Sequence, residues 1–215
     1  MGQIFEGTFT MKIAISGTHG TGKSTLLAEL EKLPELKSKF VFLGNITRKL
    51  KSTGININES GTDNTQLLVM AKHLEHYAFP DSILDRCALD GVVYTTYLYD
   101  KKQVTKNVLR IAESIFQNLN YDLTIWLRPE FPLVDDQTRS VNEEFQGQVD
   151  LLFDKYIKSY KTKHLVVTGS VEERVAQVRC AIQALENFRL EEAEVKNKMQ
   201  DFLQEQLEKF RDQYR

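Results

Sequence analysis

The segment Gly17-Thr18-His19-Gly20-Thr21-Gly22-Lys23-Ser24 decides the fold of this chain. It matches the phosphate-binding loop pattern G-x-x-x-x-G-K-S/T at every fixed position. The preceding residues, Lys12 to Ser16, form a short apolar run typical of a buried strand, and the following residues carry leucines at helical spacing to about Leu33. The motif needs a strand before it and a helix after it, so both flanks favour a P-loop domain.

The residue types of this loop suit a polyphosphate bound together with a metal ion. Gly17 and Gly22 can adopt backbone angles closed to other residues, so that main-chain N–H groups face an anion. Lys23 supplies a mobile positive charge, and the Ser24 hydroxyl can ligate Mg²⁺. We therefore expect ATP and Mg²⁺ as cofactors. The expected nucleotide-binding residues are Gly17, Thr18, His19, Gly20, Thr21, Gly22, Lys23, Ser24 and Thr25.

Two residues, one in this loop and one just after it, are expected to have supporting roles. His19 is expected to face solvent or to brace the loop, and Thr25 to cap the helix or pack near the α-phosphate. Lys23 is also expected to act as a catalytic residue, because it contacts the phosphate that is transferred.

Strand-like and helix-like segments alternate along the rest of the chain, which predicts an α/β fold with a parallel sheet and helices on both faces. The expected strands are 12–16, 40–43, 82–85, 122–127 and 164–168. The expected helices are 23–33, 45–53, 65–77, 92–99, 106–118, 148–160 and 171–185. Ligands in such a sheet bind beyond the carboxyl ends of the strands.

An acid and a base follow the third apolar strand, in Ser82-Ile83-Leu84-Asp85-Arg86. In P-loop proteins such an acid binds Mg²⁺ through water or takes a proton from an attacking hydroxyl. Asp85 is thus a candidate catalytic residue and metal ligand, and Arg86 a candidate catalytic residue that holds phosphate. The alternative is an ion pair at a strand end. Asp90 is placed either to cap the next helix or to bind substrate at the same site.

The acceptor side of the site is expected after the second strand. Arg48 can hold an acceptor monophosphate, and Gln66 can hydrogen-bond a base edge through its amide. A structural or surface role is an equal alternative for both residues.

Composition sets limits on the partners. The formal net charge is −2, so the chain has no global attraction for nucleic acid or an anionic membrane. No apolar run approaches the roughly 20 residues that cross a bilayer, and the first ten residues lack the pattern of a secretory signal. Cys87 and Cys180 show no metal-ligand spacing and are expected to be reduced thiols. We expect a cytoplasmic protein that acts on a small molecule.

The tail, residues 186–215, has no Pro or Gly and carries apolar residues at helical spacing, which predicts an amphipathic helix. This helix could pack across its own domain or form the seam of a homodimer, and too few heptads are present to decide. We divide the chain into a kinase-like domain, 1–185, and a C-terminal helical extension, 186–215.

Four segments, in this order, resemble the P-loop AAA-type ATPase/kinase family that includes the nicotinamide-riboside kinase domain and is related to thymidylate and deoxynucleoside kinases. They are Ile15 to Leu26 around the loop, Asp85-Arg86-Cys87-Ala88-Leu89-Asp90-Gly91, the lid-like stretch from Leu127 to Ser140, and Thr168 to Val175.

The resemblance implies a three-layer P-loop NTPase sandwich with strand order 2-3-1-4-5. It also implies a lid at about 128–147, on which Arg139 would close over the transferring phosphoryl group as a catalytic residue. Arg128 is a second candidate for that role and for nucleotide binding, and Gly169 would lie in the loop beside the adenine. A basic lid agrees with the chemistry, since phosphoryl transfer needs neutralised charge and excluded water.

Three functions fit these patterns. The first is a nucleoside or nucleotide kinase, with the acceptor between Arg48, Gln66 and Asp85. The second is a kinase acting on a modified base or an end of DNA or RNA, which needs a basic groove. The third is a non-kinase ATPase that works with a protein partner through the tail helix.

Overall fold

The computed structural model of this chain describes residues 10–130 and 142–213. Its centre is a five-stranded parallel sheet in the order β2-β3-β1-β4-β5, as the sequence predicts. The strands are β1 Lys12–Ser16, β2 Val41–Leu43, β3 Ser82–Asp85, β4 Leu123–Trp126 and β5 His164–Val166.

The register of the sheet brings the ends of three strands together. Ile15 of β1 pairs with Asp85 of β3 on one side and with Ile125 of β4 on the other. Because these strands run parallel, their carboxyl ends meet at one edge, where ligands bind in open α/β sheets. The acid predicted at the end of β3 therefore lies beside the start of the P-loop.

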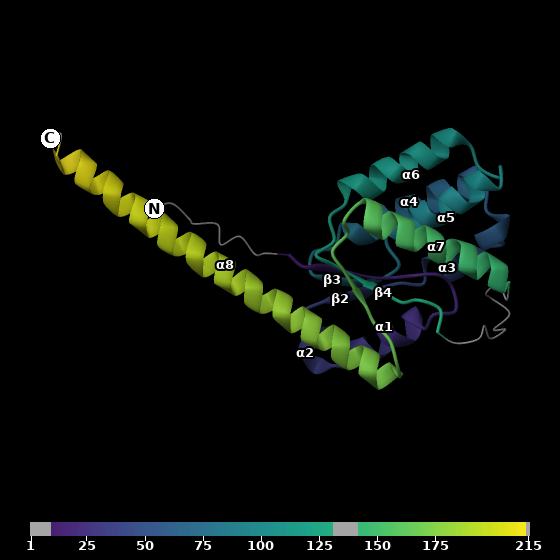
Figure 1. The fold of residues 1–215 in the computed structure, drawn as a ribbon, viewed down its shortest axis with the longest axis horizontal. Helices are drawn as coiled ribbons and strands as arrows, with labels where there is room; N and C mark the ends of the chain where they lie inside the picture. The colour runs from purple at the N-terminus through teal and green to yellow at the C-terminus, as the bar shows by residue number, and fades with distance from the viewer. Residues whose placement is uncertain (1–9, 131–141, 214–215) are drawn as a thin grey trace. The chain divides into compact units, whose positions relative to one another are not determined.

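Helices cover both faces of this sheet, which gives the expected three layers. In Figure 1 the helices α4 to α7 lie on one side of the strands, and α1 and α2 lie on the other. The helices of the domain are α1 Lys23–Glu31, α2 Pro34–Lys37, α3 Ile46–Ser52, α4 Asp63–Tyr77, α5 Ala88–Asp100, α6 Lys106–Asn118 and α7 Glu143–Ser159, with a 3-10 turn, η1, at Asn58–Ser60.

Apolar side chains from the sheet and from α5, α6 and α7 form the core on one side. Ala14 and Trp126 of the sheet belong to the same cluster as Val92, Phe116 and Phe153. Burial of this kind of surface is the main favourable contribution to folding. It also holds α5 and α7 firmly against the strand ends that carry the site.

Two helices begin four or five residues earlier than their periodicity indicates. α7 begins at Glu143 and not at residue 148, because the Asn142 side chain accepts a hydrogen bond from the Phe145 N–H at 3.0 Å. The last five residues of the expected lid, 143–147, are therefore helical. α5 begins at Ala88 and not at residue 92, because Cys87 and Asp90 form a capping box.

The chain divides into two compact units, Met1–Val175 and Ala176–Arg215. The predicted helix 171–185 and the predicted tail helix are one continuous helix, α8 Val171–Gln213. Among the described residues, no helix is both long enough and apolar enough to cross a membrane.

Candidate functional site

The P-loop turns tightly over the end of β1. Gly17 has a φ of +138°, and a Cβ there would lie 2.2 Å from the carbonyl oxygen of Leu127. Gly22 is the N-cap of α1 in the left-handed region, with a φ of +86°. Other residues rarely adopt these angles, so both glycines of the motif are required by the backbone itself. The loop thereby points the N-terminus of α1 at the space a phosphate would occupy.

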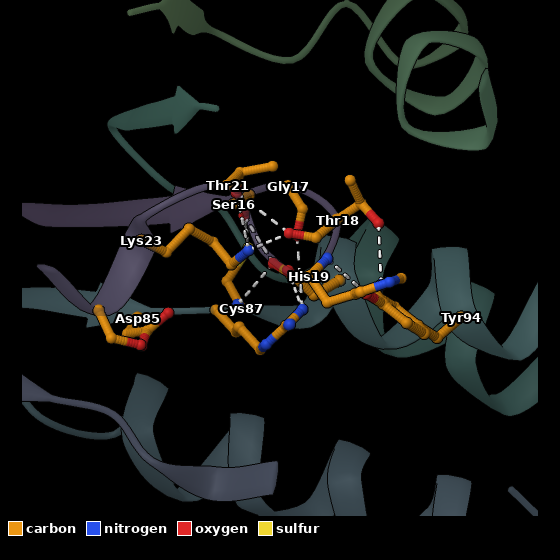
Figure 2. Close-up of polar contacts among 12 residues, drawn as sticks. Ser16, Gly17, Thr18, His19, Thr21, Lys23, Asp85, Cys87 and Tyr94 are labelled. Atoms are coloured by element: carbon orange, nitrogen blue, oxygen red, sulfur yellow. Dashed lines mark hydrogen bonds and ion pairs between the residues drawn. The ribbon is translucent and has the colours of Figure 1, made fainter. Parts of the chain in front are cut away.

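The Lys23 side chain is turned back under this loop. Its Nζ donates to the carbonyl oxygen of Thr18 and to Thr21 Oγ1, as Figure 2 shows. The lysine is buried. Its ammonium is therefore held at the loop that would surround the phosphates, which is the arrangement expected of a phosphate-binding lysine.

His19 braces the loop and does not face solvent. It is 3 % exposed, its N–H donates to Tyr94 Oη at 3.1 Å, and its carbonyl oxygen accepts from Gln146 Nε2 at 2.8 Å. The imidazole also stacks on Phe145, with ring centroids 5.0 Å apart. Of the two roles expected for His19, the structure thus supports bracing, with partners on α5 and α7.

Arg174 lies near the C-terminal end of the first compact unit and also contacts the P-loop. Its guanidinium donates to the Thr21 carbonyl at 2.8 Å, to the Gly169 carbonyl at 3.0 Å and to Glu130 Oε2 at 3.0 Å. Glu130 in turn accepts from the Gly169 N–H at 3.1 Å. These bonds fix the Gly169 loop next to the P-loop, and the expected place of this loop beside the adenine stays a prediction.

Ser24 and Asp85 meet at the carboxyl edge of the sheet. The Ser24 hydroxyl donates to Asp85 Oδ2 at 2.6 Å. Asp85 Oδ1 is buried and has no hydrogen-bond partner among the described residues. Buried carboxylate oxygens normally have partners, and a hydroxyl beside a carboxylate is an oxygen donor set that suits Mg²⁺. The residues present therefore fit the expected metal ion.

Arg86 occupies a strained position next to this pair. Its φ is +77°, in the left-handed region, which costs on the order of 1–3 kcal/mol for a non-glycine residue. Its guanidinium donates to Asp90 Oδ1 at 2.9 Å and lies 5.3 Å from the centre of the Tyr94 ring. Strain of this kind concentrates where a side chain must be aimed at a ligand.

Asp90 holds Arg86 in place and starts α5. Its Oδ2 accepts from Ser16 Oγ at 2.7 Å and from the Cys87 N–H at 3.1 Å. Burial raises the pKa of Asp90, against the opposing effect of the Arg86 and Lys23 cations. The sequence left two alternatives for Asp90, a cap of the next helix or a position at the site. The structure shows that Asp90 caps α5 and also contacts Arg86 at the site.

A cavity of about 250 Å³ lies between the P-loop, α3 and the end of β3. It brings together several residues that the sequence predicts for the phosphate and acceptor sides: His19, Gly20, Thr21, Gly22, Lys23, Ser24, Arg48, Asp85 and Arg86. The other lining residues are Asn45, which caps α3, four residues of α3, and Ile57 and Asn58 at the start of η1. Arg48 of the predicted acceptor side therefore lines the same space as six of the predicted phosphate-loop residues, His19 to Ser24.

A second, smaller cavity adjoins the first between α4 and α5. It shares Thr47, Ile57, Asn58 and Arg86 with the first cavity. Its lining also contains Gln66 and Asp90, which the sequence predicts to bind substrate, together with residues that the sequence did not single out: Thr65, Val69, His73, Gly91 and Tyr94.

Of the described residues that the sequence predicts for the site, five do not line either cavity: Gly17, Thr18, Thr25, Arg128 and Gly169. Arg128 stacks over Trp126, with 4.9 Å to the ring centre, and pairs with Asp150 at 2.7 Å. Thr25 is exposed on α1. Arg139 lies outside the described residues, so its role on the lid stays a prediction.

Sequence reasoning missed Tyr94, Gln146 and Arg174 as braces of the P-loop and His73 as a lining residue. Arg174 lies within the segment that resembles the family, which was a usable signal. His73 is seven residues after Gln66, a spacing that places both on one face of a helix. The contact of α7 with His19 spans 127 residues of sequence and gives no local signal.

A family model described as an AAA domain matches residues 12–174 of this chain. Among solved structures, deoxyadenosine kinase from M. mycoides with bound dATP is 19% identical, with a TM-score of 0.62, over 80% of this chain and 99% of that chain. The same enzyme with the products dCMP and dCDP is 20% identical, with a TM-score of 0.60, over 81% and 100%. The NadR protein in complex with NR is 16% identical, with a TM-score of 0.65, over 82% of this chain and 52% of that chain. No curated protein sequence matches.

Proposed function

The chain belongs to the AAA domain family, and on that premise we propose that it is an ATP- and Mg²⁺-dependent phosphotransferase that acts on a nucleoside or nucleotide. The observation that carries the proposal is the single cavity of about 250 Å³ in which the P-loop, Asp85 and Arg48 meet. An ATPase needs room for its nucleotide and a water molecule, whereas this cavity reaches from the P-loop to α3 and to Ile57 and Asn58. The structural neighbour from M. mycoides is a deoxyadenosine kinase, which supports this proposal.

The P-loop holds the phosphoryl donor. Its main-chain N–H groups and the N-terminus of α1 attract the phosphates, and Lys23 places its ammonium at the β- and γ-phosphates. Ser24 Oγ and Asp85 Oδ2 would hold Mg²⁺, which when bound neutralises charge on the β- and γ-phosphate oxygens, while Asp85 Oδ1 stays available for a proton. Arg174, Tyr94 and Gln146 keep the loop in the shape that this binding needs.

The acceptor lies across the α3 side of this cavity and the smaller cavity that adjoins it. Arg48 on α3 can hold a phosphate or ribose oxygen of the acceptor, and Gln66 on α4 can bind its base. Arg86 lines both cavities and stands between these two groups. Its fixed guanidinium suits charge stabilisation, because the residues around it have already oriented it.

The reaction is an in-line displacement. An acceptor hydroxyl oxygen forms a bond to the γ-phosphorus, and the bond from that phosphorus to the β–γ bridging oxygen breaks, so that ADP leaves with the electron pair. Asp85 Oδ1, which has no hydrogen-bond partner among the described residues, takes the proton of the hydroxyl. Arg86 and Lys23 neutralise the charge on the equatorial oxygens during transfer.

The test is phosphorylation of an acceptor. The protein is incubated with Mg²⁺ and ATP labelled at the γ-phosphate, against nucleosides, nucleoside monophosphates, nicotinamide riboside and single-stranded DNA. We expect label on a nucleoside or nucleotide. Label on DNA would replace this proposal with an end-modifying kinase, and release of free phosphate without any labelled acceptor would replace it with an ATPase.

A further inference from the structure

The small cavity between α4 and α5 contains a buried histidine whose hydrogen bonds are not made. His73 is 1 % exposed and lines this cavity, and neither Nδ1 nor Nε2 has a hydrogen-bond partner among the described residues. A buried imidazole without partners loses the hydrogen bonds that water would give it and gains none in return. Its position is explained if a ligand supplies the missing partner.

The surroundings fix this imidazole firmly. Gln66 and His73 project from the same face of α4, and α5 packs against that face at Gly91. A Cβ at Gly91 would lie 2.2 Å from Met70 Sδ and 3.2 Å from His73 Cδ2. Thr95 on α5 donates to Gln66 Oε1 at 3.0 Å. Both polar groups are therefore oriented before any ligand binds, as in sites that discriminate between ligands by hydrogen bonds.

The charge of this cavity disfavours a cationic ligand. Burial, with the nearby charges of Arg86 and His76, lowers the pKa of His73 to about 3, so the imidazole is neutral at physiological pH. Among the described lining residues the one carboxylate is Asp90, and it already accepts bonds from Arg86, Ser16 and Cys87. The Tyr94 ring, which could attract a cation, already lies against the Arg86 guanidinium.

We propose that His73 is a specificity-determining residue that, together with Gln66, selects acceptors with a neutral, hydrogen-bonding base over acceptors with a cationic pyridinium base. The neutral imidazole offers one donor and one acceptor, and the Gln66 amide nitrogen offers two donors. A purine or cytosine edge, with a ring nitrogen beside an exocyclic amino group, meets these groups. A pyridinium ring brings a positive charge next to Arg86, and the one carboxylate among the described lining residues, Asp90, is already bonded to Arg86, Ser16 and Cys87. This inference rests on the proposed function.

The experiment measures kcat and KM of the full chain with ATP and Mg²⁺ for adenosine, deoxyadenosine, cytidine, deoxycytidine and nicotinamide riboside. We expect kcat/KM for the preferred neutral-base nucleoside to exceed that for nicotinamide riboside by at least about 10-fold. In His73→Leu we expect KM for that nucleoside to rise about 10- to 100-fold with kcat little changed, since a buried hydrogen bond to the base is lost. His73→Gln, which keeps a donor and an acceptor, should recover part of the affinity.

His76→Leu is the matched control, because His76 lies on the same helix but does not line the cavity. Its KM should equal that of the wild type. A preference of the wild type for nicotinamide riboside, or an unchanged KM in His73→Leu, overturns the inference while leaving a kinase in place. Absence of transfer to every acceptor contradicts the proposed function instead. In that case calorimetric titration of the four neutral-base nucleosides and of nicotinamide riboside into the wild-type protein decides the inference: binding of a neutral-base nucleoside at least about 10-fold tighter than nicotinamide riboside supports it, and any other result overturns it.

Discussion

At the scale of a single residue, the proposed mechanism gives Asp85 two roles, in holding Mg²⁺ and in accepting a proton. One carboxylate oxygen accepts the Ser24 hydroxyl, and the other has no hydrogen-bond partner among the described residues. An amide in the same place keeps the shape of the side chain but loses the charge and the proton-accepting oxygen. The residue therefore affects transfer more than it affects nucleotide affinity.

Asp85→Asn should bind ATP with a dissociation constant within a few-fold of the wild type, while kcat for phosphoryl transfer falls by about 100-fold or more. Calorimetric titration gives the first quantity and the labelled-acceptor assay gives the second. Normal turnover in this variant would remove Asp85 from the mechanism.

His73 makes folding sensitive to acid. Its folded-state pKa is about 3 against an ordinary value of 6.5, so the unfolded chain binds more protons as the pH falls below about 6.5. The free energy of unfolding should then drop by about 2 kcal/mol between pH 6.5 and pH 5 from this residue alone. Urea denaturation of wild type and His73→Leu at both values isolates the effect, because the variant lacks it. Equal losses in the two proteins would refute this assignment.

At the scale of the elements, glycines in two helices should respond to the same substitution in opposite directions. Gly91 in α5 packs against Met70 and His73, whereas a Cβ on Gly147 in α7 meets nothing within 4 Å. Gly91→Ala should destabilise the protein by about 1–3 kcal/mol through overpacking. Gly147→Ala should stabilise it by up to about 1 kcal/mol, because alanine favours the helix. Denaturant midpoints of both variants measure the two effects, and an unchanged or raised midpoint in Gly91→Ala would contradict the packing described for α5.

The elements also show what local sequence can predict. The alternation of strands and helices was predicted from composition and periodicity, and the strand order came with the family resemblance; the structure confirms both. The early starts of α5 and α7 depend on Cys87, Asp90 and Asn142 as caps, which the apolar pattern does not register. Periodicity marks where a helix buries surface, and a cap marks where its backbone begins.

Some residues of the site could likewise be predicted from local sequence, and others could not. The P-loop and Asp85 were predictable because each follows a strand in a fixed local pattern. Tyr94 and Gln146 brace the loop and could not be predicted, because the residues they contact lie 75 and 127 positions away in the sequence. Arg174 is 153 positions from its partner in the loop, but it lies in a segment that resembles the family, and this was a usable signal. The positive φ of Arg86 likewise depends on the contacts of its side chain in the folded protein.

At the scale of the whole molecule, the exposed apolar face of α8 is the feature left without a described role. Eight large apolar side chains on it are each more than half exposed: Phe188, Leu190, Val195, Met199, Phe202, Leu203, Leu207 and Phe210. Their spacing places all but Leu190 on one face of the helix. Faces of this kind are usually covered by a partner, and we propose a second copy of the chain, through the same helix.

Light scattering coupled to size-exclusion chromatography should then report the mass of two chains at micromolar concentration. The double change Leu203→Glu and Leu207→Glu puts charges on the apolar face and should give the mass of one chain. Asn197→Glu, on the opposite face of the helix, should leave the dimer intact. A wild-type protein that elutes with the mass of one chain would contradict the proposal, as would a double variant that stays dimeric.

The central claim is that the first loop of the domain binds a metal-bound triphosphate, and calorimetric titration of ATP tests it most directly. With Mg²⁺ present, the wild type and Lys32→Ala, a change at an exposed lysine just after α1, should bind ATP with equal affinity. Lys23→Ala should weaken binding by about 10- to 100-fold, since a charge-assisted contact with phosphate is lost. If Lys23→Ala binds as tightly as the wild type, or if the wild type takes up no nucleotide, the loop is not a phosphate site.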